Sequence, residues 1–141
     1  MMREGAPARA LGCLLGVCLI GGCGGEKVEG PPTIPVKGKV EITKGGTTKD
    51  LADRSAAVEF QSVEQPDVRA FGSILDDGSF TMTTQVAGKG KPGAIAGSHR
   101  VRLFADEAAE RFVSPKFFKY ETSGITVKVP PEGELVIKVW K

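Results

Sequence analysis

Apolar and polar residues alternate with a period of two in seven short segments after residue 35, and this pattern limits the fold more than any other feature. Such alternation is typical of half-buried β-strands, because successive side chains point to opposite faces. Turn residues separate the segments, and Asp76-Asp77-Gly78 predicts a hairpin between two of them. The sequence therefore predicts an all-β fold: a single seven-stranded antiparallel sandwich. The predicted strands are residues 36–42, 58–61, 68–75, 80–83, 100–103, 125–129 and 135–139.

The segments between these strands are expected to be loops, with one short helical piece. Residues 43–55 form a predicted loop, and residues 105–111 are expected to form one or two helical turns. Residues 88–93 match a Gly-x-Gly-x-x-Gly spacing, but Pro92 and a strand follow where a dinucleotide site needs a helix. We therefore interpret residues 88–97 as a loop and its first part, residues 88–93, as mobile and basic.

The chain begins with a leader that is typical of exported bacterial lipoproteins. An apolar run over residues 10–20 follows a weakly basic start and ends in Ile20-Gly21-Gly22-Cys23. The run is shorter than the roughly 20 residues that span a bilayer, and small residues precede the cut in a secretory signal. We predict a lipoprotein signal peptide at residues 1–22 and lipidation of Cys23. The alternatives are cleavage by ordinary signal peptidase and a buried N-terminal helix, which the glycines disfavour.

Acyl chains on Cys23 would anchor the protein to a membrane of the cell envelope, because more than one chain gives durable binding. Gly24 replaces the aspartate that is associated with inner-membrane retention, which favours the outer membrane. Glycines and prolines over residues 24–35 predict a tether. The expected organisation is a signal at 1–22, lipidated cysteine and tether at 23–35, and a β-sandwich domain at 36–141.

Composition excludes several classes of site from the mature chain. All three cysteines (Cys13, Cys18 and Cys23) lie in the leader or at its end, so no disulfide is expected. The formal net charge of the full sequence is +2, which implies no strong attraction to nucleic acid. With one histidine and no free thiol, a zinc site is not expected, and neither is any other metal or cofactor.

Short sequence pieces, taken in order, resemble the small bacterial lipoproteins that carry a carboxypeptidase regulatory-like, transthyretin-like domain. The resemblance extends over most of residues 36–139, and the matching pieces are residues 36–40, 57–60, 72–80, 93–101, 115–117 and 123–125. The loop at 43–55 is longer than is usual in that family, and His99 stands where tyrosine is common. The resemblance implies a prealbumin-like (Ig-like) sandwich and an accessory, stabilising or adhesive role, but no activity.

His99, the single histidine, would have to serve any Ser-His-Asp arrangement. No Gly-x-Ser-x-Gly elbow is present, and alternation places His99 on the face of Val101 and Leu103. We therefore expect a hydrogen-bonded, partly buried histidine and only weakly a hydrolase. Asp76-Asp77-Gly78 lacks the remaining ligands of a calcium loop and is expected to be a turn.

Phe117, Phe118 and Tyr120 form the one candidate binding patch, because basic residues are interleaved with the rings. Alternatively, the rings close one end of the sandwich. Trp140 is expected to cover the sandwich as a lid.

The sequence predicts a non-enzymatic, lipid-anchored accessory or interaction module of the cell envelope. Its expected partners are the membrane, through Cys23, and an envelope protein bound by loops or a sheet edge. The alternative function is carbohydrate or cell-wall binding through the patch at residues 117–120.

Overall fold

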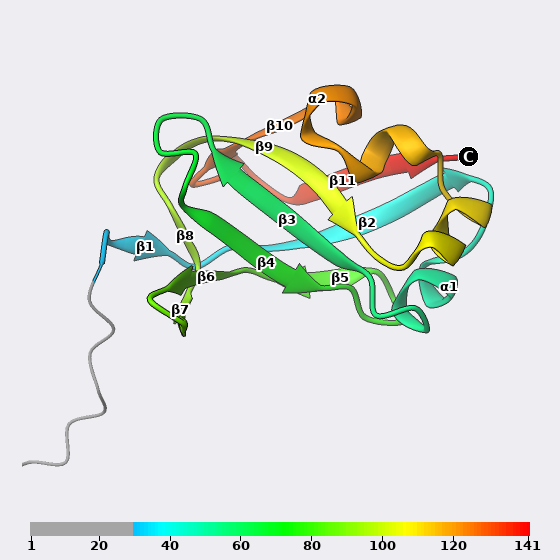
Figure 1. Ribbon diagram of the computed structural model, residues 1–141, viewed down its shortest axis with the longest axis horizontal. Helices are drawn as coiled ribbons and strands as arrows, with labels where there is room; N and C mark the ends of the chain where they lie inside the picture. The colour runs from blue at the N-terminus through cyan, green and yellow to red at the C-terminus, as the bar shows by residue number, and fades with distance from the viewer. Residues whose placement is uncertain (1–29) are drawn as a thin grey trace, which may run out of the picture.

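The computed structural model describes residues 30–141, which form a predominantly β, sandwich-like structure (Figure 1). Each of the seven predicted segments contains a strand, but the predicted count is too low, because the described residues hold eleven strands. The strands are β1 (Thr33–Ile34), β2 (Lys37–Lys44), β3 (Ala57–Ser62), β4 (Arg69–Ser73), β5 (Ser79–Thr81), β6 (Thr83–Val86), β7 (Lys89–Pro92), β8 (Ala94–Ile95), β9 (Gly97–Phe104), β10 (Ile125–Val129) and β11 (Leu135–Trp140). The helices are α1 (Thr48–Ala52), α2 (Tyr120–Ser123) and the 3-10 turns η1 (Glu107–Arg111) and η2 (Pro115–Phe118).

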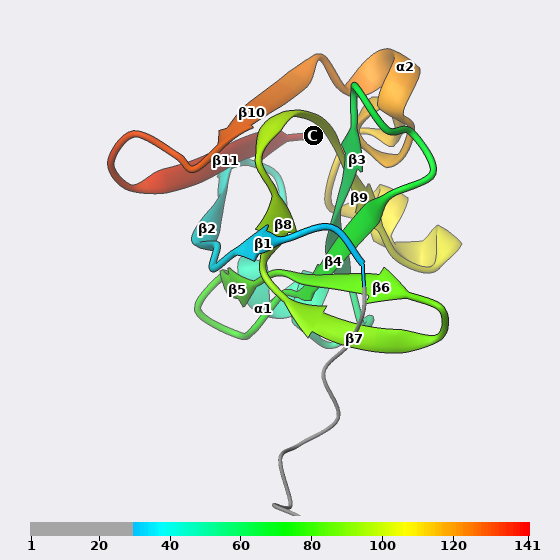
Figure 2. The same ribbon diagram turned by 90° about the vertical axis from the view of Figure 1, so that its left-hand side faces the viewer.

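Three sheets are present in the described part of the chain. The largest has the order β10-β9-β3-β4-β6-β7, and all of its pairings are antiparallel. A three-stranded sheet, β11-β2-β5, lies across the core from it, and β1 pairs with β8 at one end (Figure 2). The expectation of a wholly antiparallel sandwich is wrong at one pairing, because β11 runs parallel to β2.

The Asp-Gly turn forms, but it does not join a hairpin. Gly78 has φ +88°, as a tight turn requires, and its carbonyl accepts from Val40 N at 2.8 Å. This contact draws the next strand across the core, so β5 pairs with β2 while β4 pairs with β6. Phe80 can lie against β2 because Gly38 opposite it has no side chain; a Cβ there would stand 2.5 Å from the ring. The segment from β5 to β6 therefore passes from one sheet to the other.

The predicted loop at residues 88–97 is instead built mainly of strand. Ala87 and Gly88 have φ of 49° and 78°, which is the left-handed backbone of a two-residue hairpin turn. They connect β6 to β7, and the register runs from Val86 opposite Lys89 to Thr83 opposite Pro92. The sequence pattern missed this hairpin because Gly-Lys-Gly-Lys carries no apolar alternation. Pro92 is compatible with it because β7 is an edge strand.

The core lies between the two larger sheets and is closed at one end by short helices. Val58 and Phe60 of β3 face Val40 of β2 and Ile137 of β11, and all four are at most 1% exposed. Leu51 of α1, which is also buried, enters this core from the predicted loop at 43–55. A capping box in which Thr47 and Asp50 exchange hydrogen bonds begins α1. The predicted helical turns at 105–111 correspond to η1.

Candidate functional site

The predicted aromatic patch is not an exposed surface. Phe117 is 1% exposed and Tyr120 is 8% exposed, while Phe118 is partly buried against the core. Residues 115–118 form a 3-10 turn and 120–123 a helical turn, so neighbouring rings do not alternate as they would in an extended segment. Trp140 packs edge-on against Phe117 with ring centroids 4.9 Å apart, and it remains 41% exposed. These rings cover one part of the sandwich, which is the alternative that the sequence left open.

His99 lies on the core face, as expected, and is more completely buried than the sequence suggested. It is 1% exposed, and its Nε2 hydrogen-bonds the carbonyl of Ile95 at 2.8 Å. Its ring lies 5.6 Å from that of Phe60, within the core. The side chain therefore has a packing role in this fold.

The acidic turn at residues 76–78 is stabilised by hydrogen bonds from Ser79 to Asp77. The hydroxyl and the backbone N–H of Ser79 donate to Asp77 Oδ1 at 2.6 and 2.9 Å, and these bonds keep the pKa of Asp77 below its ordinary value. Residues 30–141 contain no group of three acidic, histidine or cysteine side chains that could hold a metal ion. Cys23, the predicted lipidation site, lies outside the described residues.

A buried carboxylate on the outer face of the six-stranded sheet was not predicted. Glu59 of β3 points away from the core, yet it is only 1% exposed. Arg102 Nη2 donates to both of its oxygens at 3.1 Å, and Tyr120 OH donates to Oε1 at 2.5 Å. Arg69 Nη1 lies 3.5 Å from Oε1. We name Glu59, Arg69, Arg100, Arg102 and Tyr120 the arginine cluster.

Strand register assembles the arginine cluster. Glu59 is directly opposite Arg102 on β9, and the next outward residue of β3, Gln61, is opposite both Arg100 and Arg69. Arg100 Nη2 donates to Gln61 Oε1 at 3.0 Å. The period-two pattern indicates that Glu59, Arg100 and Arg102 lie on polar strand faces, but their cross-strand partners depend on a register that the sequence does not state.

Tyr120 of α2 covers this cluster and explains its burial. The guanidinium of Arg102 lies 4.7 Å from the centre of the ring, and those of Arg69 and Arg100 lie 5.9 Å from it. Burial, followed by the hydrogen bond to Glu59, raises the pKa of Tyr120 well above its ordinary value. The cluster therefore contains three guanidinium groups, one carboxylate and a neutral phenol at physiological pH.

The edge strands β10 and β11, which belong to different sheets, lie next to each other. In the described residues, β10 pairs only with β9, and β11 pairs only with β2. A hollow of about 350 Å³ opens between these two edge strands. Partly buried Ile125, Val127 and Leu135 line it, together with four exposed charged residues, Lys128, Glu132, Glu134 and Lys138. The arrangement combines unpaired backbone edges with an apolar floor, which suits an added strand.

Among residues 30–141, no helix is both long enough and apolar enough to cross a membrane. Comparisons with protein-family models, with curated proteins and with solved structures find no match to this chain.

Proposed function

We propose that this protein is a non-enzymatic, lipid-anchored interaction module of the bacterial cell envelope. Its partner contributes an extended segment that lies along the β10 and β11 edges. The observation that carries this proposal is the pair of adjacent free edges with an apolar hollow between them. The finer fold assignment, a transthyretin-like sandwich, belongs to the same proposal and rests on the sequence resemblance.

The chemistry of the two edges defines the partner segment. Each edge strand presents backbone N–H and C=O groups that have no ladder partner on one side, and an added strand would pair with them. Alternate apolar side chains of the partner would enter the hollow against Val127 and Leu135. Lys128 and Lys138 line the hollow together with Glu132 and Glu134, so charged residues of either sign can be accommodated at the other positions.

The place where the described chain begins supports a docking surface at β10 and β11. Lys91 of β7 donates to the carbonyl of Pro31 at 2.9 Å, so the incoming chain is held at the β7 edge of the six-stranded sheet. The β10 strand is the opposite edge of that sheet. Figure 2 shows β10 and β11 on the other side of the domain from β7, where the first described residues lie.

Site-specific crosslinking in intact cells tests the docking surface. A photoreactive residue at Thr126 of β10 or at Val136 of β11 should capture one discrete protein through the same extended segment. The matched position is Lys39, which is exposed on the central strand of the three-stranded sheet and should give no such product.

A charge variant provides the functional control. Val136→Glu should abolish the crosslink from Thr126 because it places a carboxylate in the lining of the hollow, where apolar side chains of the partner would pack. Thr43→Glu, at an exposed position on β2, should leave the crosslink unchanged. Equal capture from Lys39, or full capture in the Val136→Glu protein, contradicts the docking site.

Anchoring is tested separately. The wild-type protein should fractionate with membranes after a high-salt wash, and Cys23→Ser should release it, because several acyl chains are needed for durable attachment. If the Cys23→Ser protein stays in the membrane fraction, the lipid anchor is wrong while the docking surface is unaffected.

A further inference from the structure

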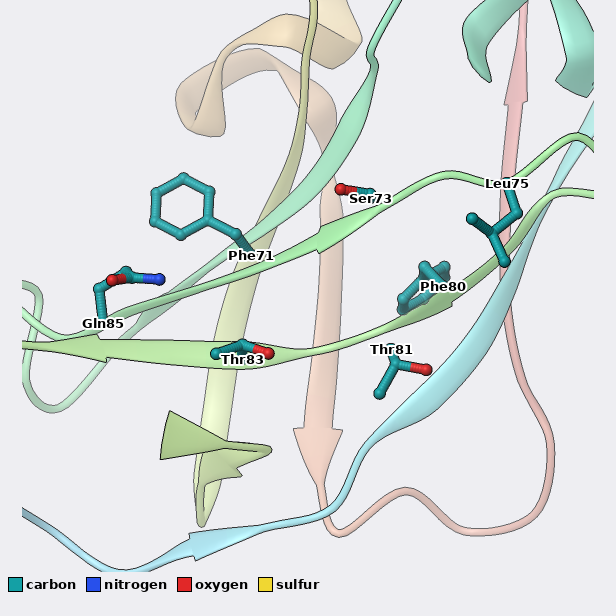
Figure 3. A pocket seen from close by; sticks show the side chains of 7 residues that line it. All are labelled: Phe71, Ser73, Leu75, Phe80, Thr81, Thr83 and Gln85. Carbon is teal, nitrogen blue, oxygen red and sulfur yellow. The ribbon is translucent and has the colours of Figure 1, made fainter. Parts of the chain in front are cut away.

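The outer face of the six-stranded sheet contains a hollow of about 460 Å³, and Figure 3 shows the side chains that line it. It forms where β5 leaves the neighbourhood of β4 to join the other sheet. Phe71 and Ser73 of β4 line it together with Thr83 and Gln85 of β6, and Phe80 is buried behind them. None of the lining side chains is charged.

This hollow and the arginine cluster form one continuous surface. Phe71 is directly opposite Glu59 in the ladder between β3 and β4, and Arg69 precedes Phe71 on the same face of β4. Phe71 also pairs with Thr83 of β6. A ligand that lies on Phe71 would therefore reach guanidinium groups on one side and hydroxyl and amide groups on the other.

The charged residues on this surface are mostly basic. Among the described residues on the outer face of the sheet, Glu59 is the single acidic strand residue, against four basic residues, Arg69, Arg100, Arg102 and Lys128. The Glu59 carboxylate accepts hydrogen bonds from Arg102 and Tyr120 and holds these side chains in place. Its single negative charge leaves the three guanidinium groups with a net positive charge. Arg69 has a side chain that is 46% exposed, and Arg100 is also exposed, so both can donate to an external anion.

We propose that this surface binds an acidic polysaccharide. A sugar ring stacks on Phe71 over the hollow, and its carboxylate or sulfate group accepts hydrogen bonds from Arg69 and Arg100. An aromatic ring beside neutral hydroxyl and amide groups suits a sugar, whereas the guanidinium pair selects for an acidic one. The glycan role that the sequence suggested is thereby placed on β4, β6 and β9 instead of residues 117–120. It does not depend on partner docking at β10 and β11.

Binding to matched acidic and neutral polysaccharides tests the proposal. Calorimetry with polygalacturonate and with its methyl ester, and with dextran sulfate and dextran, compares chains that differ in charge alone. The protein should bind both acidic chains and neither neutral chain, and the affinity should fall as salt rises. Arg69→Gln, Arg100→Gln and Phe71→Ala should each weaken binding by about fivefold or more. Lys39→Gln, at an exposed position on the central strand of the other sheet, should change it less than about twofold.

Three outcomes would overturn the inference. One is the absence of binding to both acidic polysaccharides at millimolar concentrations of the repeat unit. The second is equal binding of the neutral chains, or unchanged affinity in the Arg69 and Arg100 variants. The third is polyglutamate bound as tightly as polygalacturonate with no effect of Phe71→Ala, which would show that charge alone is recognised and no sugar.

Discussion

Replacing Glu59 by glutamine should destabilise the domain far more than an ordinary change on the outer face of a sheet. The substitution keeps the shape of the side chain but removes its charge. Glutamine has one acceptor oxygen, so an amide N–H₂ would face the donors of Arg102 where Glu59 now accepts two bonds. Tyr120 can keep a hydrogen bond, but the guanidinium loses its counter-charge.

The exposures of the partners set the size of the effect. Breaking a fully buried ion pair costs about 3–5 kcal/mol. Here the carboxylate is 1% exposed, but the side chains of Arg102 and Arg69 are 25% and 46% exposed, so water still solvates them in part. We therefore expect a loss of about 2–3 kcal/mol in the free energy of unfolding. For a domain of this size the loss corresponds to a decrease in Tm of about 8–12 °C.

Urea denaturation followed by Trp140 fluorescence measures this loss. Trp140 is the single tryptophan, and its edge-on contact with Phe117 is broken on unfolding. Glu41→Gln, at an exposed position on β2, is the matched control and should change stability by less than about 0.5 kcal/mol. Combined with Tyr120→Phe in a double-mutant cycle, Glu59→Gln should show coupling of at least about 0.5 kcal/mol. A loss below about 1 kcal/mol for Glu59→Gln would refute the reasoning, because Glu59 would then not be holding the arginines.

Two further predictions concern the phenol and the turn. Because burial raises the pKa of Tyr120 above its ordinary 10.0, its contribution to stability is complete below about pH 10 and is lost as the pH rises above that value. Urea midpoints in alkaline buffers should therefore fall less steeply for Tyr120→Phe, and the phenolate absorbance of the single tyrosine should appear only as the wild-type protein unfolds; ionisation of the folded protein near pH 10 contradicts this. Gly78→Ala should lower the free energy of unfolding by about 2 kcal/mol more than Gly88→Ala, measured by urea denaturation. Both glycines have positive φ, but a Cβ at Gly78 would stand 2.4 Å from the Val40 carbonyl, whereas nothing lies within 4 Å at Gly88; equal losses would show that the contact is unimportant.

Much of the secondary structure follows from short-range patterning. Alternation located all seven predicted strand segments because one face of each strand packs on a core and the other meets polar surroundings. His99 could be assigned to the core by the same rule, since it lies in phase with Val101 and Leu103, and all three are buried. The helical turn near residue 107 was also evident from the sequence.

Sheet membership required the tertiary structure. The residues around Asp77 predicted a turn and the structure contains one, but the strand after it joins β2 instead of β4, because Gly78 approaches Val40 and Phe80 lies against Gly38. The parallel pairing of β11 with β2 joins strands at opposite ends of the domain sequence, and no local pattern reports it. The β6–β7 hairpin was missed because glycine and lysine carry no apolar alternation.

The candidate surfaces show the same difference between what the sequence indicates and what only the tertiary structure decides. The sequence by itself indicated that Glu59, Arg100 and Arg102 lie on the polar faces of their strands, because the period of a strand is fixed by its backbone. Tertiary structure alone decided that these residues meet, that Tyr120 covers them and that β10 and β11 are left as neighbouring edges. The physical reason is that side-chain direction is a local property of the chain, whereas register, sheet order and burial depend on contacts between residues that are distant in sequence.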